Sequence, residues 1–180
     1  MKEKLHEEII DSEIVYSGNL VDVVKDTVRL PNGTLTVREI VKHRGVVTML
    51  AIVNEAIIMV RQFRHACGKT LLELPAGTLN SGEFPDEAAR RELIEETGYV
   101  PGQMKQLLRF YVSPGYCSER VYLYLATDLS KTVQDLEADE AIRVVKVTMD
   151  TALHMIERNE IEDAKSIVGI LYLSKYLRDS

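Results

Sequence analysis

Three glutamates in the middle of the chain, Glu92, Glu95 and Glu96, have the type and the spacing to bind a divalent cation. Strong helix formers surround them, and the sequence predicts a helix that starts at Pro85 and ends just before Gly98. On this helix the three carboxylates share one face, because they lie three and four residues apart. Carboxylate oxygens are the ligands that Mg²⁺ and Mn²⁺ prefer. A solvated, glutamate-rich surface helix is the alternative interpretation.

The charges on this helix indicate what a site here would do. Arg91 can pair with Glu87 and Glu95, four residues away on either side, which leaves Glu92 and Glu96 opposed. A carboxylate site that holds two or more Mg²⁺ ions, with Mn²⁺ as a substitute, suits a diphosphate, whose oxygens need neutralising and orienting. The residues therefore predict metal-assisted hydrolysis of a P–O–P bond.

The elements around this helix predict a mixed-sheet α/β (α+β) sandwich. Strand patterns cover residues 7–43, 46–54, 55–64, 70–76, 100–112, 119–127 and 141–148, a polar loop covers 128–140, and helical patterns cover 149–160 and 161–177. The apolar run 46–54 is typical of a central strand that is buried on both faces. Regular alternation of strands and helices is missing, so a purely parallel sheet is not expected. We predict a small antiparallel sheet domain over residues 1–44 and a second domain over 45–180.

The composition excludes several classes of partner. The 180 residues are 46% hydrophobic and 28% charged, with a net charge of −6 and a pI near 5.3. An acidic chain without a basic stripe is not expected to bind nucleic acid. No apolar run has the length of a membrane span, and the charged N-terminus does not resemble a signal peptide. Cys67 and Cys117 form no CxxC motif, which favours reduced thiols and a cytoplasmic location.

The segment from Gly77 to Tyr99 resembles the Nudix box: a glycine, five residues, a glutamate, seven residues, then Arg-Glu-apolar-any-Glu-Glu-any-Gly-apolar. The box positions are occupied without a gap by Gly77, Glu83, Arg91, Glu92, Leu93, Glu95, Glu96, Gly98 and Tyr99. The resemblance implies an α/β/α sandwich and an enzyme that hydrolyses a nucleoside diphosphate linked to another group. A nucleotide sensor that has lost the chemistry is a remote alternative, and it predicts a broken box.

The same resemblance implies a role for each matching residue. Glu92 and Glu96 match the main metal ligands, and Glu95 shares the site. Ala76 precedes the first glycine of the box and matches a residue whose backbone carbonyl binds a metal. Arg91 and Glu83 match positions that hold the box in shape, and we place Arg91 with Glu95 among the catalytic candidates.

A second signature concerns the substrate. The triplet 113–115, Ser-Pro-Gly, is followed by Glu119 and resembles the SPG motif of the ADP-ribose pyrophosphatases. It implies that ADP-ribose is hydrolysed to AMP and ribose 5-phosphate, with Pro114 and Glu119 as substrate-binding candidates. The alternative is another sugar nucleotide, such as GDP-mannose.

Four further residues are candidates for substrate binding. Arg38 and Glu39 stand in a segment that resembles the RExVxH motif of the same subfamily, and Arg64 ends its QFR motif. The resemblance implies a homodimer formed through the N-terminal sheet, which helps to hold the adenine or the terminal ribose. Arg61 and Arg64 are candidate pyrophosphate contacts, because guanidinium matches phosphate oxygens in two-point fashion. Ordinary surface charge is the alternative for all four.

The catalytic base is where the chain departs from the subfamily. Relatives have two glutamates, two residues apart, in the acidic loop and use one of them to activate water. Here Glu140 matches the second position, as a metal ligand and base candidate, but Ala138 stands at the first. Either Glu137 or Asp139 substitutes, or Glu140 acts alone, or the base lies elsewhere.

Overall fold

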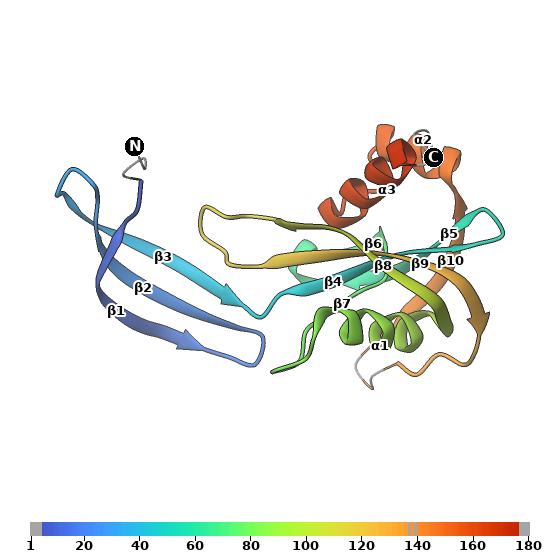
Figure 1. The fold of residues 1–180 in the computed structure, drawn as a ribbon, viewed down its shortest axis with the longest axis horizontal. Helices are drawn as coiled ribbons and strands as arrows, with labels where there is room; N and C mark the ends of the chain where they lie inside the picture. Colours follow the sequence, from blue (N-terminus) through green and yellow to red (C-terminus); the bar gives the residue numbers. More distant parts are fainter. Residues whose placement is uncertain (1–4, 137, 139, 177–180) are drawn as a thin grey trace. The chain divides into compact units, whose positions relative to one another are not determined.

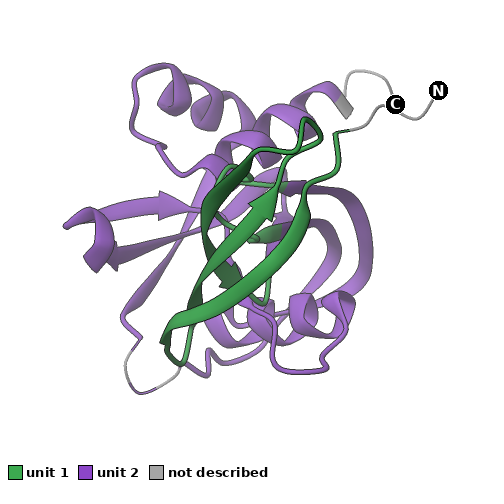
Figure 2. Cartoon of the chain, turned by 90° about the vertical axis from the view of Figure 1, so that its left-hand side faces the viewer, with its two compact units in different colours: residues 1–45, 111–120 green, residues 46–110, 121–180 purple. Residues whose placement is uncertain are grey.

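The computed structural model describes residues 5–136, 138 and 140–176 and divides the chain into two compact units. The first comprises residues 1–45 and 111–120, and the second comprises 46–110 and 121–180 (Figure 2). The N-terminal unit therefore includes the Ser-Pro-Gly segment, which is distant in sequence from its strands.

The first unit is built on an antiparallel three-stranded sheet. Its strands are β1 (Glu8–Ser17), β2 (Val21–Arg29) and β3 (Leu35–His43), in the order β1-β2-β3. Residues 111–120 attach to β3: Val41 donates its N–H to the Tyr116 carbonyl at 2.8 Å and accepts from the Ser118 N–H at 2.9 Å. These bonds place the Ser-Pro-Gly turn against the last strand of the small sheet.

The second unit contains a seven-stranded mixed sheet in the order β10-β5-β4-β9-β8, with β6 paired to β5 and β7 paired to β4. The strands are β4 (Val46–Val53), β5 (Ala56–Arg64), β6 (Lys69–Glu73), β7 (Ala76–Thr78), β8 (Tyr99–Tyr111), β9 (Arg120–Lys131) and β10 (Ile142–Thr148). A short 3₁₀ turn, η1 (His65–Cys67), joins β5 to β6. Strands β4 and β9 are parallel, and β4, β5, β6, β7 and β10 pair antiparallel.

Three helices cover the two faces of this sheet. Helix α1 (Pro85–Thr97) lies on one face, and α2 (Met149–Glu157) and α3 (Ala164–Tyr176) lie on the other (Figure 1). Within β4, Met49 packs in the core cluster that contains Leu93 of α1, while Leu50 packs in the cluster that contains Ile170 of α3. Both faces of β4 are thus buried, as predicted.

The predicted fold class is confirmed, and α1 has the predicted bounds. Its end is fixed by Gly98, which adopts φ +67° and donates its N–H to the Ile94 carbonyl at 2.8 Å. The strand expected over 70–76 is divided: β6 ends at Glu73, and the chain turns at Pro75 into β7. The loop expected from 128 begins later, because β9 continues to Lys131. In the described part of the chain, no helix is long and apolar enough to cross a membrane.

Candidate active site

The two central carboxylates of α1 lie against strand β7. Glu96 is 2% exposed, and its Oε2 accepts the N–H of Ala76 at 2.9 Å. Glu92 lies against Gly77, so closely that any side chain at residue 77 would overlap its carboxylate. The residues predicted as metal ligands, Ala76, Glu92 and Glu96, are therefore brought together by the packing of α1 on β7.

Arg91 holds the rest of the box together. Its guanidinium binds both oxygens of Glu83, at 2.8 and 3.0 Å, while its Nη1 donates to Glu92 at 2.7 Å and to Glu95 at 2.9 Å. The bonds from Arg91 hold the pKa of Glu83 below its usual range. The expected pair with Glu87 is not formed, because the Glu87 carboxylate accepts the N–H of Phe84 at the start of the helix. Arg91 thus contacts Glu92, one of the two opposed glutamates for which the sequence predicted no positively charged partner.

Burial and the neighbouring negative charges disfavour the ionised forms of the two central carboxylates. Burial raises the pKa of Glu96 to about 8, and the charges of Glu92 and Glu140 add to this, although the Ala76 N–H and Arg64 oppose it. Burial likewise raises the pKa of Glu92 to about 7, against the opposing effect of Arg91. Buried carboxylates in this state are the donor set that a divalent cation would stabilise, so the residues fit Mg²⁺ or Mn²⁺.

Two of the carboxylates of α1, Glu92 and Glu95, are bonded to Arg91. Across the described residues, no group of three or more His, Cys, Asp or Glu side chains is placed closely enough to hold an ion. The predicted ligands Glu92, Glu96 and Ala76 nevertheless lie together where α1 packs on β7.

Glu140 lies near the cluster. It is half-buried, and its charge contributes to the raised pKa of both Glu92 and Glu96. Ala138, at the departing position, is exposed in a turn. Glu137 and Asp139, the two suggested substitutes, lie outside the described residues. The structure brings Glu140 to the carboxylates, and its role as base or ligand stays a prediction.

Two arginines of β5 point to opposite faces of the sheet. Arg64 lies on the α1 face, within electrostatic reach of Glu96, and its guanidinium is bound by Glu73. Arg61 is opposite Leu72, a member of the core cluster that packs against α2 and α3. Because side chains alternate along a strand, residues three apart face opposite ways. The structure does not bring Arg61 to the carboxylates, although its role as a substrate contact is untested.

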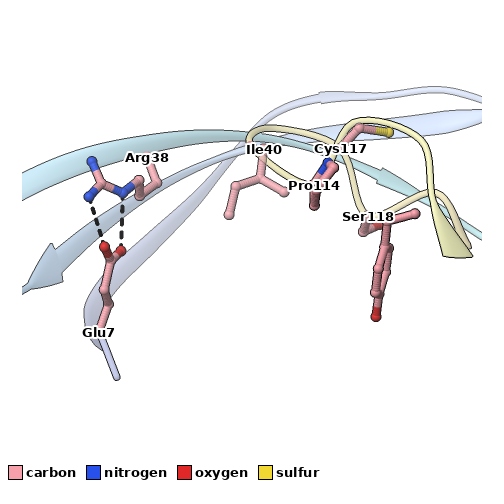
Figure 3. Close-up of a pocket in the computed structure, with 8 residues that line it drawn as sticks. Glu7, Arg38, Ile40, Pro114, Cys117 and Ser118 are labelled. Carbon is pink, nitrogen blue, oxygen red and sulfur yellow. Dashed lines mark hydrogen bonds and ion pairs between the residues drawn. The ribbon is translucent and has the colours of Figure 1, made fainter. Parts of the chain in front are cut away.

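The N-terminal unit carries the remaining candidates. A hollow of about 450 Å³ is lined by Glu7, Arg38, Ile40, Tyr111, Pro114, Gly115, Cys117 and Ser118 (Figure 3). Arg38 binds both oxygens of Glu7, at 3.0 and 2.8 Å. Glu39 is exposed opposite Lys25, and Glu119 is half-buried just after the Ser-Pro-Gly turn. Glu7 was missed by the sequence analysis, because no local pattern connects residues 31 positions apart.

Comparisons with known proteins agree with this architecture. The NUDIX domain family matches residues 42–167, and the family described as nucleoside diphosphate sugar hydrolase N-terminal domain matches residues 7–41. A Bacillus subtilis protein named ADP-ribose pyrophosphatase is 44% identical over 172 residues, which cover 94% of this chain and 93% of that protein. A Bacillus methanolicus protein named methanol dehydrogenase activator is 42% identical over 176 residues, which cover 96% and 95%.

A solved structure described as an ADP compounds hydrolase superimposes with a TM-score of 0.88 over 99% of this chain and 98% of that one. At 22% identity this likeness shows the fold alone. A mixed sheet between helices, with a glutamate-rich box helix on one face, defines a Nudix-type hydrolase domain. This chain belongs to the Nudix hydrolase family, and it carries the N-terminal domain of the nucleoside diphosphate sugar hydrolases.

Proposed function

We propose that this Nudix hydrolase cleaves the diphosphate of ADP-ribose, giving AMP and ribose 5-phosphate, with Mg²⁺ or Mn²⁺ held by the carboxylates of α1. One observation carries the proposal: Glu92 and Glu96 lie together against β7, where burial raises the pKa of both carboxyl groups. The substrate assignment is supported by the 44% identity to a protein named ADP-ribose pyrophosphatase.

The residues of the box have different roles in the proposed metal site. Glu92, Glu96 and the carbonyl of Ala76 would be the ligands, and Glu95 would share the site. When bound, two or more divalent ions would neutralise the diphosphate and lower the pKa of an attacking water. Arg91 and Glu83 keep the loop before α1 against the helix, since two hydrogen bonds join Glu83 in the loop to Arg91 in the helix.

Glu140 is the proposed general base. Hydrolysis adds water across the P–O–P bond: the water oxygen joins one phosphorus, and the bridging oxygen leaves with the other phosphate. Glu140 takes the proton that the water loses. Its charge already acts on Glu92 and Glu96, so it lies in the neighbourhood where the water would be activated.

The N-terminal unit is proposed to bind the nucleoside and to form a homodimer. Its β1 strand is exposed at all ten positions, and Ile9, Ile14 and Tyr16 are 62%, 67% and 58% exposed. Apolar strands that stay exposed are typical of surfaces that pair with another chain. The hollow beside Arg38 and Pro114 would receive part of the ADP-ribose. The free thiols of Cys67 and Cys117 suit a reducing, cytoplasmic environment.

A substrate panel tests the proposal directly. Purified protein with Mg²⁺ is incubated with ADP-ribose, GDP-mannose, UDP-glucose, NADH and diadenosine polyphosphates, and phosphatase-sensitive products are measured. We expect the highest kcat/KM with ADP-ribose. A preference for another diphosphate would reject the substrate and keep the metal chemistry, whereas no turnover with Mg²⁺ or Mn²⁺ would reject both.

A further inference from the structure

A buried carboxylate next to the site has no role in the metal cluster. Glu73, at the end of β6, is 1% exposed. Its two oxygens accept hydrogen bonds from Nε and Nη2 of Arg64, at 2.8 and 2.9 Å. The Arg64 side chain is 36% exposed, so one partner is buried while the other reaches the surface. This geometry fixes one edge of the guanidinium.

Glu73 is itself held from the other side by the start of α3. Lys165 places its Nζ 3.7 Å from Glu73 and 2.6 Å from Asp163. Asp163 also accepts the Ser166 hydroxyl hydrogen bond at 2.6 Å, and the Ser166 oxygen accepts the N–H of Leu74 at 2.7 Å. The end of β6 is therefore fixed by side chain and backbone to α3, and Glu73 has little freedom to move.

Arg64 lies on the side of the sheet that carries the glutamates of α1. The Glu96 charge acts on Arg64, and the two bonds to Glu73 use Nε and Nη2, so that Nη1 has no partner in the described part of the chain. Guanidinium binds phosphate through two neighbouring donors in a fixed plane. A guanidinium held by one edge keeps the plane and the remaining donors in a constant position.

Stability alone does not explain this arrangement. Taking a carboxylate out of water is costly, and apolar residues of similar volume commonly serve a core as well as or better than a buried ion pair. We propose that Glu73 is a positioning residue: its carboxylate holds Arg64 by one edge, so that Nη1 stays available to a phosphate of the diphosphate substrate. The inference rests on the proposed function.

The first test is a pair of variants and their combination. Wild type, Glu73→Gln, Arg64→Gln and the double variant are assayed for kcat and KM with ADP-ribose, or with the best substrate of the panel. We expect each single variant to lower kcat/KM by about 10- to 100-fold, the usual cost of losing a partner that orients a site. Glu73→Gln should add little to Arg64→Gln, because it acts through that residue.

Controls separate positioning from folding. Glu162→Gln removes a carboxylate from an exposed pair with Lys69 and should leave kcat/KM unchanged. Melting temperatures are measured for every variant. If Glu73→Gln does not fold, Arg64→Lys is the alternative test. Lysine keeps the charge but cannot form the paired hydrogen bonds to Glu73, so we expect the same loss of kcat/KM as for Arg64→Gln.

Three results would overturn the inference. The first is a wild-type kcat/KM in Glu73→Gln, and the second is wild-type activity in Arg64→Lys. The third is that Glu73→Gln lowers kcat/KM by the same factor in the Arg64→Gln background as in the wild-type protein. The wild-type protein is assayed first: if it hydrolyses no diphosphate, the proposed function fails and the inference fails with it. If it is active and the variants behave otherwise than expected, only the positioning role of Glu73 is rejected.

Discussion

The carboxylate of Glu92 fills the space that a side chain at Gly77 would need: a Cβ there would lie 1.9 Å from its Cδ and 2.2 Å from each oxygen. Distances this short require either the loop or the carboxylate to move. We expect Gly77→Ala to displace Glu92 from its place against β7 and to lower kcat by about tenfold or more, because a small displacement of a group in the active site strongly reduces the rate of the reaction. Steady-state kinetics measure the effect.

A second glycine controls for this prediction. Gly33 has open space around its Cβ position but adopts φ +88°, so Gly33→Ala strains the backbone at a turn far along the sequence from the box. It should lower the melting temperature and leave kcat unchanged. Full activity in Gly77→Ala would contradict the assigned position of Glu92.

Glu96→Gln tests the metal site itself. The amide oxygen can still accept the Ala76 N–H, so we expect the fold to persist. The negative charge is lost, and kcat should fall by about 100-fold or more. Mutating a residue that only hydrogen-bonds to a metal ligand already lowers activity by up to about 100-fold. Glu87→Gln, on the same helix, is the matched control. Added Mg²⁺ should raise the melting temperature of wild type and of the control but not of Glu96→Gln; an equal rise in all three would remove Glu96 from the ligand set.

Arg38→Gln tests the hollow of the N-terminal unit. The variant removes the guanidinium that lines the hollow with Pro114, so we expect a higher KM for ADP-ribose with a smaller change in kcat. Arg29→Gln breaks a similarly exposed ion pair, with Glu8, on the same sheet and outside the hollow. An equal rise of KM in both variants would indicate a general effect of charge on the sheet.

The local features of the fold were predictable from sequence. Helix α1 follows from a proline at its start and Gly98 at its end, and the burial of β4 follows from its continuous apolar run. The grouping of Glu92 with Glu96 needs only the helical period. These features depend on residues within a few positions of one another, and spacing alone fixes them.

The features that were missed join distant segments. Glu73 is buried beside Lys165, which lies 92 positions away on another element. The bond between Glu7 and Arg38 depends on where the chain enters the first sheet. Tertiary packing decides such contacts, and one sequence carries no local signal for them.

Ile14→Lys tests the proposed dimer. Ile14 is 67% exposed on β1, and a charge in the middle of an apolar interface should shift the protein from dimer to monomer. Light scattering after gel filtration reports the mass. Glu13→Lys places a lysine at the preceding residue, which points to the opposite face of the strand, and should keep the dimer. A wild-type monomer would reject the dimer, and dissociation by both variants would show that the effect does not depend on the face.

Asp163→Ala tests a stabilising contact through its pH dependence. Burial alone would raise the pKa of Asp163, but the Lys165 charge and the bonds from Lys165 and Ser166 outweigh it and hold that pKa below its usual range. The pKa of Asp163 is lower in the folded state than in the unfolded state. Its ionised carboxylate therefore stabilises the fold above the ordinary pKa of about 3.9, and this stabilisation is lost as the pH falls through the folded-state pKa. We expect Asp163→Ala to lower the free energy of unfolding by about 1–3 kcal/mol at neutral pH.

The difference between wild type and Asp163→Ala should shrink in acid, and urea unfolding at about pH 7 and about pH 3.5 measures it. Asp150→Ala is the matched control, because Asp150 is an exposed acid in the first turn of α2. It should cost about 0.5 kcal/mol or less, as surface changes usually do. A difference for Asp163→Ala that is the same at both pH values would show that the contact depends on hydrogen-bond geometry, and that the carboxylate charge contributes nothing to the stability of α3.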